Sequence, residues 1–287
     1  MSSAVADARA ATASFPSREI VHARIGGENF VVAFALLGPF SRHLRAIYGY
    51  ARLVDELGDS APGDRQALLD ALEAELDLAY SGSPRHPLLQ ELGQTIRDRS
   101  LPREPFLRLI EANRRDQVHT DYETFTDLRS YCELSANPVG ELVLHVFGAA
   151  TRDRIALSND VCTALQLVEH WQDVGEDAAR GRIYLPGEDR SRFGVAAEEL
   201  NGSTTSRRLR DLLAFECARA SELLASGAGL TASLHGRARI AVAGYVAGGR
   251  AALDALAAAD YDVLGSRPRP TRGRRLWLSL LAWGGLG

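Results

Sequence analysis

Carboxylates and an arginine interrupt an otherwise apolar stretch at residues 48–59, YGYARLVDELGD. On a helix these polar residues would share one face, because residues three and four positions apart are neighbours on the helix surface. Two interpretations are open. The acids form the solvated side of a surface helix, or they hold a cation that offsets the repulsion between carboxylates one turn apart. The stripe consists of Tyr48, Arg52, Asp55 and Asp59, with Glu56 beside it.

A second apolar segment, residues 160–177, carries a similar stripe and repeats the four-residue interval between two aspartates. Two such stripes predict a cavity that both line, and ligand sets of oxygen alone favour Mg²⁺ shared with the phosphates of a substrate. A di-iron centre is not expected, because its Glu-x-x-His pairs are missing, and a single histidine on such a helix is typical of a polar core residue. The stripe of this segment consists of Gln166, Glu169 or His170, Asp173 and Asp177.

The elements that must position these stripes are helices, since apolar residues recur at helical spacing through most of the chain. We find no alternating pattern of the kind that indicates a strand. The breaks between segments carry Pro, Gly or Ser and are short. The sequence therefore predicts a single all-α domain of about ten helices over residues 21–266, with tails at 1–20 and 267–287. Clear helical patterns lie at 65–81, 104–118, 207–226 and 235–260.

Composition limits the classes of partner and compartment. The chain has 287 residues, 46% of them hydrophobic, so it can bury a sizeable core. It carries 33 basic and 37 acidic residues, a net charge of -4, so no nucleic-acid partner is expected. Its three cysteines lie far apart, which suits neither a disulfide framework nor a metal site, and residues 1–20 lack the apolar run of a signal peptide. A cytoplasmic location is therefore expected.

The C-terminal residues 267–287 join the basic run RPRPTRGRR to the apolar run LWLSLLAWGGLG. The apolar run is too short to cross a bilayer of roughly 30 Å. Basic residues beside Trp277 and Trp283 suit a peripheral contact with an anionic leaflet, here the inner face of the plasma membrane. The alternative is that this segment docks on the protein's own surface, and the sequence does not decide between the two.

The two acidic segments resemble the paired aspartate-rich motifs of the squalene/phytoene synthases. YGYARLVDELGD is similar to the first motif and LQLVEHWQDVGEDAARGRIYLP to the second, and the likeness runs from GGENFVVAFALL to YDVLGSRPRP, most of the chain. The resemblance implies the all-α isoprenoid-synthase fold, a single-domain helical bundle with a central cavity in which the two motifs lie on facing helices.

Within the family, the stretches GGENF, YCELSANPVG and EHWQDV most resemble the hydroxysqualene synthases of bacterial hopanoid pathways. These enzymes convert presqualene diphosphate and water to hydroxysqualene without nicotinamide, so the resemblance implies Mg²⁺, a prenyl diphosphate substrate and handover to other enzymes of the squalene pathway. The alternative within the family is head-to-head condensation of two prenyl diphosphates to presqualene diphosphate or phytoene. A further alternative is a helical binding protein that keeps the fold without catalysis.

The resemblance also implies roles by position. The metal ligands would be Asp55, Asp59, Asp173 and Asp177, with Glu56 and Glu169 as further candidates. The catalytic residues near the leaving group would be Tyr48, Arg52 and Tyr131. The substrate-binding residues would be Asn29, Phe30, Phe34, Asn137, Gln166, Arg182 and Tyr184. Three positions depart from the usual family pattern: Glu56 replaces an aspartate, Glu169 an asparagine, and Gln172 an arginine.

Overall fold

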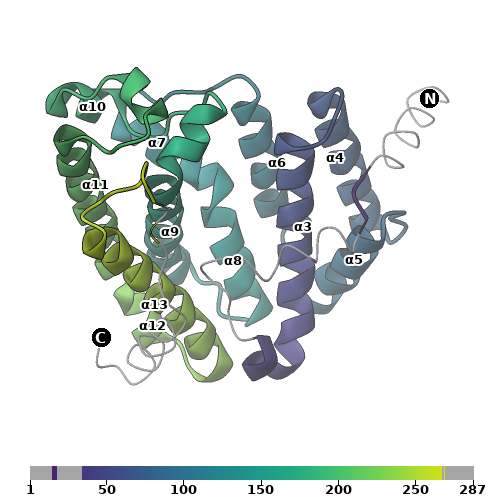
Figure 1. Ribbon diagram of the computed structural model, residues 1–287. Coiled ribbons are helices and arrows are strands. Elements are labelled where there is room, and N and C mark those ends of the chain that lie inside the picture. The colour runs from purple at the N-terminus through teal and green to yellow at the C-terminus, as the bar shows by residue number, and fades with distance from the viewer. Residues whose placement is uncertain (1–14, 18–33, 267, 269–287) are drawn as a thin grey trace. The chain divides into compact units, whose positions relative to one another are not determined.

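The computed structural model describes residues 15–17, 34–266 and 268, and its regular structure is helical (Figure 1). Within those residues the only strand-like pairing is an isolated bridge between Asp121 and Ile183. The prediction of an all-α protein is therefore confirmed. The helical patterns at 65–81 and 207–226 coincide with α4 (Arg65–Ser81) and α11 (Arg207–Ser226).

The described residues fall into two compact units, which hold the two acidic segments separately. Unit 1 contains residues 15–17, 34–118 and 138–150, and unit 2 contains residues 119–137, 151–266 and 268. The elements of unit 1 are η2 (Phe34–Phe40), α3 (Ser41–Asp59), α4, α5 (Pro87–Arg99), α6 (Glu104–Asp116) and, from its second residue on, α8 (Asn137–Val146). The elements of unit 2 are α7 (Phe125–Ser135), α9 (Arg152–Ala179), α10 (Gly187–Phe193), η3 (Ala197–Asn201), α11, α12 (Ala228–Ser233) and α13 (Gly236–Ala258).

In unit 1, helix α3 packs against α4, α5 and α6. The apolar residues between its polar positions, Leu53, Val54 and Leu57, are completely buried and supply the core. Local signals set the helix ends: the Asp64 side chain accepts from the backbone N–H of Ala67 at the start of α4. The polar stripe of α3 therefore stands on a helix whose other faces are fixed by packing.

In unit 2, the long helix α9 packs against α7, α11, α12, α13 and η3 (Figure 1). The hydroxyl of Thr151 caps its first turn by accepting from the Arg154 N–H, 3.4 Å away. Leu167, Val168 and Trp171 are completely buried. Apolar contacts thus cover most of the helix that carries the second stripe, as the sequence predicted.

Helix α13 is the one helix of the described residues that is long and apolar enough to cross a membrane by length and composition alone. However, 56% of its apolar window is buried inside the protein, which is typical of a core helix. The two tail predictions fall outside the described residues, except for positions 15–17 and 268.

Candidate functional site

The first polar stripe lies on α3 in unit 1. Arg52 Nε donates to the Tyr48 hydroxyl over 3.0 Å, and Arg52 Nη1 lies 3.5 Å from Asp55 Oδ2. The guanidinium is thereby held between a phenol and a carboxylate on one helix face. Asp59, one turn further on, is exposed, and Glu56 is partly exposed. The structure brings the predicted residues of this stripe together, with their carboxylates accessible to water.

Helix α6 supports this stripe from the side, a feature that the sequence analysis missed. Asn113 Nδ2 lies 3.5 Å from Asp55 Oδ1 and donates to the Leu109 carbonyl over 3.3 Å. One turn later, Gln117 Nε2 donates to the Gly58 carbonyl over 2.9 Å. The sequence signal that could have indicated this contact is Asn113 itself, a polar residue one turn after Leu109 on the apolar side of α6. These two amides fix the last turn of α3 relative to α6.

The Asp55 carboxyl group is the electrostatically perturbed member of the stripe. Desolvation by the surrounding protein raises its pKa, the Asp59 carboxylate adds to the rise, and Arg52 and Asn113 oppose it. Because 49% of the Asp55 side chain is exposed, water limits the effect. A nearby cation would favour the ionised form, which is the form that binds metal.

The second polar stripe lies on α9 in unit 2. Gln166 Nε2 lies 3.1 Å from His170 Nε2, and His170 Nδ1 lies 3.7 Å from Asp177 Oδ2. His170 is buried, as expected for a polar core residue, and it connects two predicted site residues that are three helical turns apart. Glu169 and Asp173 are partly buried on the same helix.

A cluster of aromatic rings surrounds His170. Its ring stacks on Tyr184 with centroids 3.6 Å apart and planes 17° apart. The Tyr131 ring lies 5.7 Å from Tyr184 and 6.2 Å from His170, and the Tyr122 ring lies 5.4 Å from Tyr131. The structure therefore places the predicted catalytic Tyr131 and the predicted substrate-binding Tyr184 in one buried cluster.

The segment that follows α9 is tied to the chain before α7. Ile183 N donates to the Thr120 carbonyl over 2.7 Å, and Gly187 N donates to the Tyr122 carbonyl over 2.9 Å. These bonds hold Tyr184 against the ring cluster. A cavity of about 10 Å³ remains there, room for about one water molecule. Its lining is His170, Val174, Asp177, Arg182, Ile183, Tyr184, Leu185 and Leu200.

Two further positions have structural contacts. Asn137 is buried and accepts a hydrogen bond from the Thr163 hydroxyl over 3.1 Å. Gln172, which stands where many family members have arginine, is buried and donates to the Pro268 carbonyl. Binding of substrate by Asn137 stays a prediction. Three predicted substrate-binding residues have no described side chain: Asn29, Phe30 and Phe34.

Comparison with known proteins decides the family. The model of the squalene/phytoene synthase family matches residues 23–275. The chain belongs to the squalene/phytoene synthase family. The sequence-based resemblance is thereby confirmed.

Similar proteins carry several different names. The chain is 33% identical to a hydroxysqualene synthase of Zymomonas mobilis over 72% of this chain and 71% of that protein. It is 30% identical to a 15-cis-phytoene synthase of Synechocystis over 89% of this chain and 80% of that protein. Among solved structures, squalene synthase HpnC of Alicyclobacillus acidocaldarius is 40% identical, with a TM-score of 0.77 over 88% of this chain and 98% of that one. A dehydrosqualene synthase is 25% identical, with a TM-score of 0.83 over 99% of each chain. These matches place this family member in the all-α isoprenoid-synthase fold.

The residues of both stripes fit Mg²⁺. Each stripe offers a pair of aspartates one helical turn apart, together with a neighbouring glutamate. Among the described residues, no three His, Cys, Asp or Glu side chains are grouped closely enough to hold a metal ion by themselves. Mg²⁺ usually binds through one or two carboxylates plus water and substrate phosphates, so carboxylate pairs suit a metal that arrives with a diphosphate.

Proposed function

We propose that this synthase converts presqualene diphosphate and water to hydroxysqualene and diphosphate in a Mg²⁺-dependent reaction that needs no nicotinamide. The observation that carries the proposal is the pair of one-turn aspartate intervals, Asp55–Asp59 on α3 and Asp173–Asp177 on α9, in a squalene/phytoene synthase. The choice of product is supported by the hydroxysqualene synthases among its relatives.

In this reaction the bond between carbon and the diphosphate oxygen breaks, and the oxygen of water bonds to the rearranged carbocation. The leaving diphosphate accumulates negative charge, and Mg²⁺ bound to the aspartates supplies electrostatic stabilisation of that charge. The proton released by the captured water leaves to solvent or to the diphosphate.

The chain's own residues would bind the ion and the diphosphate and would shield the carbocation from water. The aspartates of each stripe would hold Mg²⁺, and Arg52, held by Tyr48, would offer donors to a diphosphate. Arg182 and Tyr184, which line the small cavity beside Asp177, would offer further donors to a diphosphate. The Tyr131 hydroxyl donates a hydrogen bond to the departing oxygen or carries its proton. Apolar side chains wall off the cation from premature capture by water.

Head-to-head condensation of two prenyl diphosphates is the second candidate. It is supported by the phytoene synthases among the relatives, which align over as much as 90% of this chain. The two candidates differ in substrate: the first consumes presqualene diphosphate alone, and the second consumes two prenyl diphosphates.

Product analysis separates the two candidates. Purified protein would be incubated with Mg²⁺ and either presqualene diphosphate or farnesyl diphosphate, without nicotinamide, and the extracted products identified by mass spectrometry. We expect hydroxysqualene from presqualene diphosphate, with its oxygen labelled when the reaction runs in ¹⁸O-water. The second candidate would be favoured if the protein converted farnesyl diphosphate to presqualene diphosphate or another condensation product. In that case presqualene diphosphate supplied alone would not be converted to hydroxysqualene.

A further inference from the structure

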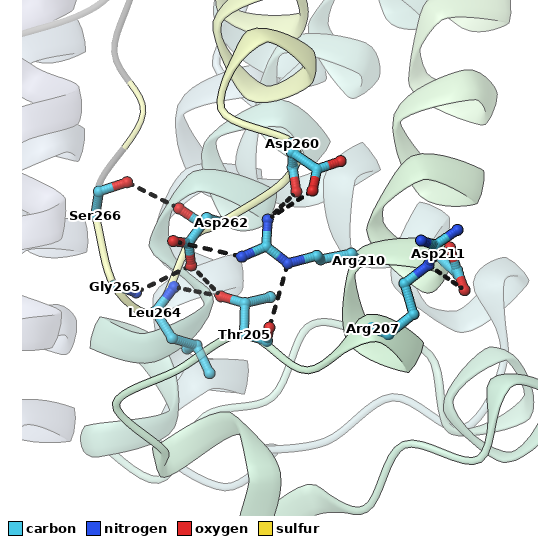
Figure 2. Close-up of polar contacts among 9 residues, drawn as sticks. All are labelled: Thr205, Arg207, Arg210, Asp211, Asp260, Asp262, Leu264, Gly265 and Ser266. Atoms are coloured by element: carbon cyan, nitrogen blue, oxygen red, sulfur yellow. Dashed lines mark hydrogen bonds and ion pairs between the residues drawn. The ribbon is translucent and has the colours of Figure 1, made fainter.

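The chain leaves helix α13 through a strained turn. Asp260 and Tyr261 have φ angles of 50° and 56°, the left-handed region that residues other than glycine rarely adopt. Such a conformation costs free energy of folding and persists only where the surroundings hold it. Figure 2 shows that the surrounding polar groups converge on this turn and on the residues after it.

The turn is stabilised mainly by Arg210 of α11. Its Nη1 donates to the Asp260 carbonyl and lies 3.1 Å from Asp260 Oδ2 (Figure 2). Its Nη2 lies 3.5 Å from Asp262 Oδ2, and its Nε donates to the Thr205 carbonyl over 3.2 Å. One side chain therefore joins the end of α13 to the start of α11.

Thr205 extends this network to residue 264. Its hydroxyl donates to Asp262 Oδ1 over 2.7 Å and accepts from the Leu264 N–H over 3.0 Å. The Gly265 N–H also donates to Asp262, over 3.3 Å. Residues 260–266, which we call the clasp, are thus closed by hydrogen bonds from Arg210 and Thr205.

The clasp contacts the turn of α9 that carries the second aspartate pair. Gly175 lies between Asp173 and Asp177, and a Cβ atom at Gly175 would lie 3.1 Å from Leu264 Cδ2. The Leu264 side chain thus packs directly on the α9 backbone, where glycine leaves room for it. Just after the clasp, the Pro268 carbonyl accepts a hydrogen bond from Gln172, the residue before Asp173.

We propose that the clasp fixes the Asp173–Asp177 turn in its metal-binding position, with Leu264 as the positioning residue that contacts the turn and Arg210 as the residue that closes the clasp. The inference rests on the proposed function, because it concerns the carboxylates assigned to Mg²⁺. Residues that orient metal ligands without touching the ion typically change metal affinity by 10- to 100-fold.

The test compares four variants. Leu264→Ala removes the contact with Gly175, and Arg210→Met opens the clasp while keeping an unbranched side chain. Arg207→Met is the matched control, since Arg207 lies on the same helix and pairs with Asp211 (Nε to Oδ1, 3.0 Å) without reaching the clasp (Figure 2). Leu264→Met, which restores apolar contact, serves as the conservative variant.

The readout is Mn²⁺ binding in the presence of inorganic pyrophosphate, followed by the electron paramagnetic resonance signal of free Mn²⁺, with circular dichroism and Tm recorded in parallel. We expect Leu264→Ala and Arg210→Met to weaken Mn²⁺ binding by about tenfold with helix content unchanged. Arg207→Met and Leu264→Met should bind like the wild type.

Two results would overturn the inference in different ways. Wild-type affinity in both Leu264→Ala and Arg210→Met, even with a lowered Tm, would show that the clasp only stabilises the fold. If the wild-type protein bound no Mn²⁺ with pyrophosphate, the metal assignment of the proposed function would fail and the clasp would lose its role with it. Because neither measurement uses a prenyl substrate, the choice between the two candidate reactions does not affect the outcome.

Discussion

Asn113 of α6 fills the space beside Gly58 of α3, so that a Cβ atom at Gly58 would lie 2.0 Å from Asn113 Oδ1 and 2.8 Å from its Cγ. Contacts below 3.0 Å essentially never occur for real Cβ atoms. The same asparagine reaches Asp55, three residues before Gly58. The small size of residue 58 thus allows α6 to support the first aspartate stripe.

Replacing Gly58 with alanine should therefore destabilise the protein. The added methyl group would overlap with the amide of Asn113 and would also lie 3.0 Å from the Cβ atom of Asn113. Rotation of the amide does not move that Cβ atom, so it does not relieve the overlap. Overpacking of this kind costs about 1–3 kcal/mol in free energy of unfolding. A contact as short as 2.0 Å puts this site in the upper part of that range, above the gain of about 1 kcal/mol from the higher helix propensity of alanine. Urea denaturation would measure the loss.

Gly244→Ala is the matched control, because Gly244 also lies inside a helix but a Cβ there meets no atom within 4 Å. This variant should be as stable as the wild type or slightly more stable. Equal stability of the Gly58→Ala variant would mean that α6 yields easily and does not fix the stripe.

Conversion of Asp55 or Asp173 to asparagine should abolish turnover. The amide is neutral and is a weaker ligand for Mg²⁺ than a carboxylate, so stabilisation of the leaving diphosphate is lost. We expect kcat to fall by at least about 10²-fold, with the circular dichroism spectrum unchanged. Asp70→Asn, which alters an exposed carboxylate paired with Arg114, should retain activity. Wild-type turnover in the Asp55 or Asp173 variant would refute the metal assignment.

The sequence allowed prediction of those parts of the fold and site that follow from the spacing of residues along one helix. Asp55 and Asp59 share a face of α3, and Asp173 and Asp177 share a face of α9, because side-chain direction along a helix follows from residue spacing alone. The boundaries of α4 and α11 could also be predicted, because local capping residues, Asp64 and Ser206, stand at their starts.

Contacts between distant segments could not be predicted in this way. Asn113 contacts Asp55, which lies 58 positions earlier in the chain, and no periodic sequence pattern predicts that contact. The contact of Leu264 with Gly175 likewise depends on how the end of α13 turns back toward α9. Such contacts are set by tertiary packing, which a single sequence read for local patterns does not contain.

Tyr131→Phe should lower turnover while keeping the fold. Phenylalanine preserves the ring packing with Tyr122, His170 and Tyr184, so Tm should change little. Loss of the hydroxyl removes the proposed donor to the leaving diphosphate, and kcat should fall by about 10²-fold. Tyr122→Phe, a change in the same ring cluster outside the family motif, should leave kcat near the wild-type value. If both variants turned over equally fast, Tyr131 would be a packing residue.

A buried acid pair in unit 2 gives a prediction that does not involve the site. The Glu216 carboxylate is completely buried on α11, and Arg219 Nη1 lies 3.2 Å from both of its oxygens and 2.9 Å from Asp189 Oδ2 of α10. Burial raises the pKa of Glu216 to about 8, with Asp189 adding to the rise and Arg219 opposing it. Two carboxyl groups thus share a single guanidinium, and Glu216 is mainly protonated at pH 7.

This raised pKa fixes the sign of a pH dependence of stability. In the unfolded chain Glu216 loses its proton near pH 4.5, whereas in the folded protein it keeps the proton to about pH 8. The folded state therefore binds more protons over that interval, and the stability contributed by the protonated group is lost as pH rises from 4.5 to 8. Between pH 6 and pH 9 the free energy of unfolding should fall by about 3 kcal/mol through this group, because the folded pKa lies about two units above pH 6 and each unit corresponds to about 1.4 kcal/mol.

Glu216→Gln should remove most of that decline, because the neutral amide has no proton to lose. Urea denaturation at pH 6 and pH 9 would compare this variant with the wild type and with Glu222→Gln, an exposed position on the same helix. We expect the wild type and Glu222→Gln to lose stability in parallel while the Glu216→Gln curve stays flatter. Parallel loss in all three proteins would place the pH dependence elsewhere and would mean that Arg219 keeps Glu216 ionised at neutral pH.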